Sequence, residues 1–187
     1  MAKKALKKAK RTKKTKSSTS TSLSSVLSLA KKRLHADITP VMQQVRDVIA
    51  ALETELKKQK LKARVILGGS LAKNTYLPGD HDVDVFVAFD YSLKSSDLST
   101  LLGHVLGKIK HVSIIRLHGS RDYFQLTTSS SSLTFELIPV LDIKNPEAAL
   151  NITDCSPLHV SWVKKQIAKN KKLADEIKLT KAFCKAV

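Results

Sequence analysis

The sequence predicts an α+β fold, in which helices pack on a mixed β-sheet and a helical segment follows the sheet. Several segments carry apolar residues at three- and four-residue spacing, which is typical of amphipathic helices. Other segments are short and apolar or alternate between apolar and polar residues, as strands do. The chain of 187 residues is 42% hydrophobic and 26% charged, so it is long enough for one sizeable core or two small ones.

The N-terminal segment 1–36 is expected to be disordered. Residues 1–16 contain nine Lys or Arg and no acid, so they supply nine of the 17 net positive charges. Such a block repels itself and cannot bury a core, and the Ser/Thr run at 17–25 is typical of a flexible linker. The tail would either prolong residence on RNA through phosphate contacts or serve only as a solubilising or nuclear-localisation-like segment.

Ordered structure is expected to start near Asp37. The spacing of apolar residues predicts a helix over 38–59, with Thr39 as its N-cap and Pro40 at its first position. The later elements follow from alternation, helical spacing and turn residues. They are a strand at 63–67, a helical turn at 70–76, a strand at 81–89, a helix within 95–110, strands at 111–118 and 123–128, a hairpin turn at 127–134, a strand at 133–140, and helices at 158–167 and 173–187.

This order divides the chain into a domain built on the sheet at 37–150, which is the candidate for the chemistry considered below, and the start of a helical domain at 151–187. No apolar run approaches the ~20 residues that a bilayer span needs, and the N-terminus has no secretory h-region, so membrane insertion and export are not expected. Cys155 and Cys184 have neither a CxxC partner nor metal-ligand spacing, which is typical of an intracellular protein without disulfides. The expected location is the cytoplasm.

Three carboxylates lie in one five-residue stretch of this basic chain: Asp80, Asp82 and Asp84. Alternation along the strand places Asp82 and Asp84 on one face. Two Mg²⁺ ions held by carboxylates can neutralise phosphate oxygens and align an oxygen nucleophile for nucleotidyl transfer. Glu136 is the lone acid of the 133–140 strand, so it is the candidate third carboxylate.

A glycine-rich turn precedes these acids. Gly69 and Ser70 open a predicted helical turn, whose backbone N–H groups and positive dipole end suit phosphate oxygens. Lys73, one turn further along, can add a positive charge. Taken singly, each feature has a plain structural alternative: an ordinary strand-to-helix turn, a solvated surface pair, or an edge-strand charge. Together and in this order they indicate a metal site.

The string GGSLAKNTYLPGDHDVDVFVAF resembles the motif of the DNA polymerase β-type nucleotidyltransferase superfamily. Within it, the chain resembles the archaeal, class I CCA-adding tRNA nucleotidyltransferases. ITP ahead of the first helix, FELIP, DCSPLHVSWVKKQI and DEIKLTKAFCKA resemble successive segments of that family. The resemblance spans about residues 37–187 and implies a polymerase β-like palm domain.

The resemblance also implies roles for individual residues. Asp82, Asp84 and Glu136 would be the catalytic ligands of Mg²⁺, with Glu136 helping to activate the tRNA 3′-hydroxyl. Ser70 and Lys73 would face the triphosphate. His159 and Lys181 would contact the nucleotide at its phosphates or ribose; without the family, they would be an ordinary capping or core histidine and a solvated helix lysine.

Two departures from the family qualify this expectation. Glu136 stands where the family commonly has aspartate, and the extra methylene shifts the carboxylate. Family members also continue past the position of Val187, through domains that complete the base-selecting pocket and grip the tRNA. We therefore expect a truncated product, a minimal transferase, or half of a split enzyme completed by a second polypeptide.

The expected activity is Mg²⁺-dependent addition of CMP and AMP, from CTP and ATP, to the tRNA 3′ end, with release of pyrophosphate. An oligoadenylate or second-messenger synthase, or a generic RNA-tailing enzyme, would share the catalytic residues. A non-catalytic RNA-binding relative of the same fold is the alternative from another class.

Overall fold

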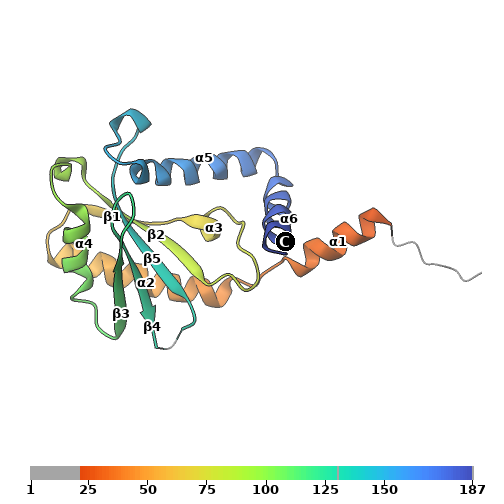
Figure 1. The fold of residues 1–187 in the computed structure, drawn as a ribbon, viewed down its shortest axis with the longest axis horizontal. Coiled ribbons are helices and arrows are strands. Elements are labelled where there is room, and N and C mark those ends of the chain that lie inside the picture. The colour runs from red at the N-terminus through yellow and green to blue at the C-terminus, as the bar shows by residue number, and fades with distance from the viewer. Residues whose placement is uncertain (1–21, 130, 187) are drawn as a thin grey trace, which may run out of the picture.

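A five-stranded mixed sheet forms the centre of the protein (Figure 1). The structure is a computed structural model, and it describes residues 22–129 and 131–186. The strands lie in the spatial order β1-β2-β5-β4-β3. Among the pairs formed by these strands, β2 and β5 run parallel and the other three pairs are antiparallel. Their bounds are β1 Ala63–Leu67, β2 Asp82–Phe89, β3 Val112–Leu117, β4 Tyr123–Thr128 and β5 Thr134–Leu141.

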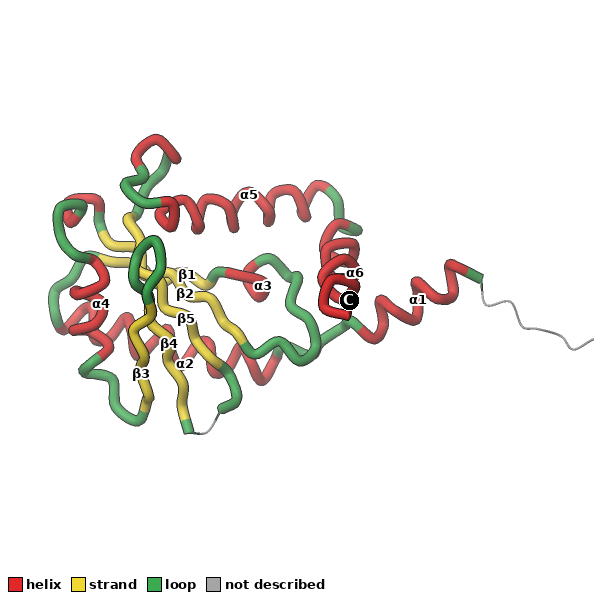
Figure 2. Tube along the Cα trace, in the orientation of Figure 1, coloured by secondary structure: helices red, strands yellow, loops and turns green. Residues whose placement is uncertain are grey.

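Helices cover both faces of the sheet and extend beyond one end of it (Figure 2). The predicted α+β class is therefore confirmed. None of the helices in the described ranges combines the length and hydrophobicity needed to cross a membrane. The α-helices are α1 Leu23–Arg33, α2 Thr39–Lys58, α3 Gly69–Ala72, α4 Leu98–Leu106, α5 Ser156–Lys169 and α6 Leu173–Ala186, and the short 3-10 helices are η1 Tyr91–Leu93, η2 Pro146–Ala148 and η3 Ile152–Cys155.

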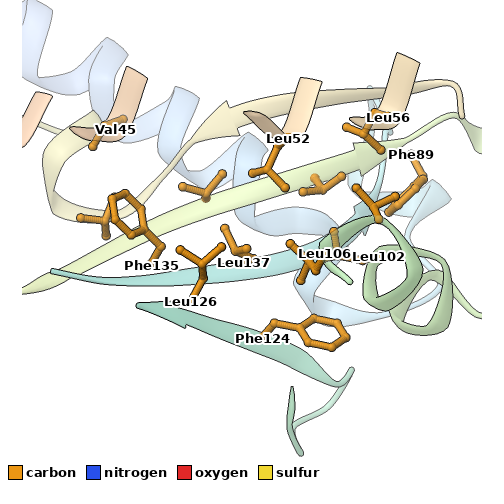
Figure 3. Packing of buried hydrophobic residues seen from close by; sticks show 14 of the residues in the cluster. Val45, Leu52, Leu56, Phe89, Leu102, Leu106, Phe124, Leu126, Phe135 and Leu137 are labelled. Carbon is orange, nitrogen blue, oxygen red and sulfur yellow. The ribbon is translucent and has the colours of Figure 1, made fainter. Parts of the chain in front are cut away.

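The main core lies between the sheet and the pair of helices α2 and α4 (Figure 3). Every second residue of β2 and β5 points into it, so both strands present apolar side chains on this face. Leu52 of α2 and Leu102 of α4 are completely buried there. Asp97 caps α4 by accepting hydrogen bonds from the backbone N–H groups of Ser99 and Thr100.

The opposite face of the sheet is covered at one end by α5. Val160 of α5 packs with Phe86 and Ala88 of β2 and Val140 of β5 in a second, smaller core. This cluster occupies the later halves of β2 and β5, so the beginnings of both strands lie outside it on this face. The carboxylates described below lie at those beginnings.

Helix α1 corrects the expectation that residues 1–36 are disordered; residues 1–21 lie outside the described part of the chain. Leu23, Val26, Leu27 and Ala30 recur at helical spacing, and Ser22 caps the first turn through a 3.3 Å hydrogen bond from the backbone N–H of Ser25. Three basic residues in the last turn complement the helix dipole. The Ser- and Lys-rich composition concealed this periodicity.

Two further boundaries differ from the prediction. Thr39 is the first residue of α2 rather than its cap. The backbone N–H of Thr39 donates a 2.9 Å hydrogen bond to the Asp37 carboxylate. The helix expected over 70–76 is shorter, because α3 ends at Ala72 and Asn74 adopts a positive φ of 57°. The other predicted helices and strands are confirmed to within a few residues at each end.

A buried ion pair joins the sheet to the segment before α5. Asp154 is completely buried and accepts hydrogen bonds from the backbone N–H groups of Leu141, Leu150 and Asn151 at 2.8–3.1 Å. Arg121 pairs with both oxygens of this carboxylate. Burial raises the pKa of Asp154, but the Arg121 guanidinium and the backbone donors outweigh it and lower the pKa overall.

Replacing Arg121 should therefore destabilise the fold strongly. Arg121→Leu leaves the Asp154 carboxylate buried without its cation, which typically costs about 3–5 kcal/mol. The matched control is Arg64→Leu, because Arg64 pairs with Asp142 in a more exposed position, where a pair contributes at most about 1 kcal/mol. Urea unfolding of both variants measures the difference; equal losses would contradict the buried pair's role.

Candidate active site

The three predicted carboxylates lie on one face of the sheet. Asp84 of β2 and Glu136 of β5 are direct partners in the parallel register, so their side chains project from the same face of the sheet. The backbones of neighbouring strands lie about 4.8 Å apart. Asp82 precedes Asp84 by two residues and shares that face. Val83, between them, is completely buried on the opposite face. The sheet thus places together the acids that the sequence predicted together.

Gln125 extends this row onto the next strand. It is the register partner of Glu136 across the β4–β5 pair, and its Nε2 donates a 3.3 Å hydrogen bond to Glu136 Oε1. The interaction fixes one oxygen of the longer acid. Sequence reasoning missed Gln125. Alternation along the 123–128 strand, combined with the hairpin at 127–134, was the signal that could have found it.

The turn between β1 and α3 packs tightly against these carboxylates. Gly69 has φ of 58°, and a Cβ there would overlap Asp84 Oδ2. A Cβ at Gly68 would overlap the Phe86 ring, and the Gly68 N–H donates a 2.8 Å hydrogen bond to the Asp84 carbonyl. Both glycines are therefore required. The first N–H groups of α3, at Gly69 and Ser70, have no acceptor within the helix.

The surroundings of Asp84 disfavour its charged form. Burial raises its pKa, Lys73 and Lys181 oppose that shift, and the charge of Asp82 adds to it; the net effect is a raised pKa. Lys73 is the C-cap of α3, so the turn that packs on Asp84 also brings a cation toward it. The two lysines therefore offset only part of the effect of burial on Asp84.

Asp80 has a different environment from the other two aspartates. Its carboxylate accepts a 3.0 Å hydrogen bond from the Leu77 N–H and pairs with Lys181, at 3.3 Å, and with Lys185. Burial raises the pKa of Asp80, but these donors outweigh it and lower the pKa overall. The positive partners of Asp80 are thus lysines of α6, and Asp80 is not one of the three predicted metal ligands.

Lys181 and His159 are placed differently from each other. Lys181 Nζ donates to the Thr75 carbonyl at 3.1 Å and to Asp80, close enough to influence Asp84. His159 is exposed on α5, and no hydrogen bond or ion pair links it to the carboxylates in the described part of the chain. Within the same part, no three His, Cys, Asp or Glu side chains form a ready-made metal cage.

Comparisons with known proteins agree with this geometry. Residues 49–181 match the family model described as a nucleotidyltransferase domain. The chain is 41% identical over 123 residues to a CCA-adding enzyme of Nanoarchaeum equitans, covering 66% of this chain and 29% of that enzyme. It is 31% identical over 158 residues to a CCA-adding enzyme of Pyrococcus horikoshii, covering 80% and 32%.

The resemblance to archaeal CCA-adding enzymes is thereby confirmed, although the chain spans about a third of the length of these relatives. A solved structure of a cytoplasmic RNA terminal U-transferase has the same fold, with a TM-score of 0.63 and 15% identity over 86% of this chain and 44% of that one. The family model covers most of the sequence, including the carboxylates, the glycine turn and Lys181. The chain belongs to the nucleotidyltransferase domain family.

Proposed function

We propose that this chain is the catalytic part of a Mg²⁺-dependent tRNA nucleotidyltransferase, which adds CMP and AMP from CTP and ATP to the tRNA 3′ end. The observation that carries the proposal is the in-register pairing of Asp84 with Glu136, beside the Gly68-Gly69 turn. The choice of tRNA rests on the similarity to CCA-adding enzymes over up to 80% of the chain. The U-transferase structure supports only the fold.

The donor set fits Mg²⁺. Asp82, Asp84 and Glu136 offer carboxylate oxygens, which this hard cation prefers. Burial raises the pKa of Asp84 despite two nearby lysines, so a bound cation would offset that desolvation. Because these three side chains do not close into a cage, water and substrate phosphates would complete the coordination. When bound, Mg²⁺ would neutralise phosphate charge and favour ionisation of the attacking hydroxyl.

The residues of this chain would position the two substrates. The 3′-oxygen of the RNA bonds to the α-phosphorus, the bond from that phosphorus to the β-phosphate oxygen breaks, and pyrophosphate leaves. Glu136, oriented by Gln125, would assist removal of the hydroxyl proton. Gly69, Ser70 and Lys73 would bind phosphate oxygens through N–H groups and an ammonium, with Lys181 and His159 as further nucleotide contacts.

The cytoplasm would be the site of action. Generic RNA tailing is the second candidate, because such an enzyme would share the proposed catalytic residues. The two activities separate by primer choice, because a CCA-adding enzyme extends tRNA lacking its CCA end and stops after completing it.

Asp84→Ala should abolish nucleotide addition. Loss of this carboxylate removes a proposed ligand of the reacting metal, so the rate of extension should fall by roughly a thousandfold or more. The measurement uses pure protein, radiolabelled CTP or ATP, Mg²⁺ and tRNA lacking CCA. Asp142→Ala, at the other end of the sheet, is the matched control and should extend normally. Retained extension by Asp84→Ala would contradict the proposal.

Asp84→Asn should stabilise the protein in the absence of Mg²⁺. The folded-state pKa of Asp84 is raised, so the ionised carboxylate disfavours the fold at neutral pH, and that cost fades as the pH falls through the folded-state pKa. The amide should raise the melting temperature by roughly 2–4 °C at pH 7. The gain should vanish at a pH low enough to protonate the wild-type residue.

Mg²⁺ provides the second arm of this measurement. Added Mg²⁺ should raise the melting temperature of the wild type more than that of Asp84→Asn, since a ligand that binds the folded state stabilises it. An Asn variant that melts below the wild type at pH 7, or that responds equally to Mg²⁺, would show that the Asp84 charge is already satisfied within the protein.

A further inference from the structure

One carboxylate fastens α6 to the loop that leads into β2. Figure 1 shows α6 beside the connection from α3 to β2, and the contacts between them converge on Asp80. Lys181 and Lys185 are four residues apart, so they lie one turn apart on the same side of α6 and reach the same acceptor. Asp80 is largely buried, with its side chain 10% exposed.

The loop that carries Asp80 is itself held in place. The Tyr76 hydroxyl donates to the Asp80 carbonyl, and the Leu77 N–H donates to Asp80 Oδ2 at 3.0 Å. Thr75, Tyr76 and Leu77 are all buried. Asp80 therefore sits on a rigid support rather than on a mobile tip, two residues before Asp82. A group fixed by this carboxylate is fixed relative to the start of β2.

The ammonium of Lys181 is the group that is fixed most closely. Its Nζ is bound by two acceptors, the Thr75 carbonyl at 3.1 Å and Asp80 Oδ2 at 3.3 Å, and the side chain is 33% exposed. A lysine has a flexible four-carbon stem and loses rotamer freedom when it engages a ligand. Here much of that freedom is already lost in the folded protein, which lowers the entropic cost of a later contact.

We propose that Asp80 is a positioning residue for nucleotide binding, which holds Lys181, with Lys185 beside it, so that the Lys181 ammonium meets the triphosphate preorganised. The inference rests on the proposed function. For triphosphate binding by a variant without the Asp80 charge, it predicts the opposite of what Coulomb attraction alone predicts. Removing a negative charge near an anion site should strengthen triphosphate binding by Coulomb attraction, whereas loss of a positioning residue should weaken it.

The test compares Asp80→Asn with Asp175→Asn. The amide keeps the size of Asp80 and an acceptor oxygen for the Leu77 N–H, while the attraction for both lysines is lost. Asp175 also lies on α6 and pairs with Lys31 of α1 at 3.4 Å, so its variant makes the same charge change away from the loop. The readouts are the Kd for ATP and CTP with Mg²⁺ by calorimetry, and KM and kcat for tRNA extension.

Asp80→Asn should raise the Kd and KM for nucleotide about tenfold, with kcat changed less than about threefold, while Asp175→Asn binds as the wild type does. In a Lys181→Met background the Asp80 substitution should have little further effect, because the group that it positions is gone. A purely structural Asp80 would instead give a loss that adds to that of Lys181→Met.

Other results overturn the inference. Binding by Asp80→Asn that equals or exceeds that of the wild type, or that matches Asp175→Asn, would show that Asp80 does not position Lys181 for nucleotide. A wild-type protein that binds nucleotide without extending tRNA would refute the proposed function, while the calorimetric comparison would still decide the role of Asp80. A wild-type protein that binds no nucleotide would refute both.

Discussion

The close approach of the Gly68-Gly69 turn to β2 is the constraint on which the site depends. Neither glycine has room for a side chain, because Phe86 and the Asp84 carboxylate occupy the space that a Cβ would need. A backbone hydrogen bond from Gly68 to Asp84 fixes the turn on the strand. The same contact that desolvates Asp84 also brings the first N–H groups of α3 beside it, so the carboxylate and these amides are positioned together.

The hydrophobic core sets the geometry of the carboxylates. Asp84 and Glu136 face each other because Val83 and Val85 of β2 and Phe135 of β5 are buried on the opposite face. A slip of one residue between β2 and β5 would turn one strand's apolar side chains toward the polar face, so the register is strongly specified. The polar row continues to Gln125 for the same reason. The alignment of the carboxylates is thus a consequence of apolar burial.

Local pattern predicted most of this arrangement, and long-range pairing accounts for what it missed. Alternation identified the 81–89 strand and the common face of Asp82 and Asp84. The 133–140 strand was predicted from its apolar run, and Glu136 was selected only as its lone acid. The two lysine partners of Asp80 lie 101 and 105 residues away along the chain. Arg121, the cation that pairs with Asp154, lies 33 residues away. No local spacing reveals such pairs. Helix α1 was missed because composition was weighed above its four-residue apolar period.

Asp80 and Asp84 are four residues apart, but their pKa values are shifted in opposite directions. Asp80 has its cations built into the fold, and the two lysines lower its pKa despite burial. Asp84 is desolvated more completely than Lys73 and Lys181 offset, so its pKa is raised. A fold selected for stability alone would satisfy both acids. Asp84 lies where β2, β5 and the glycine turn meet, and a cation bound there would offset the desolvation of its charge.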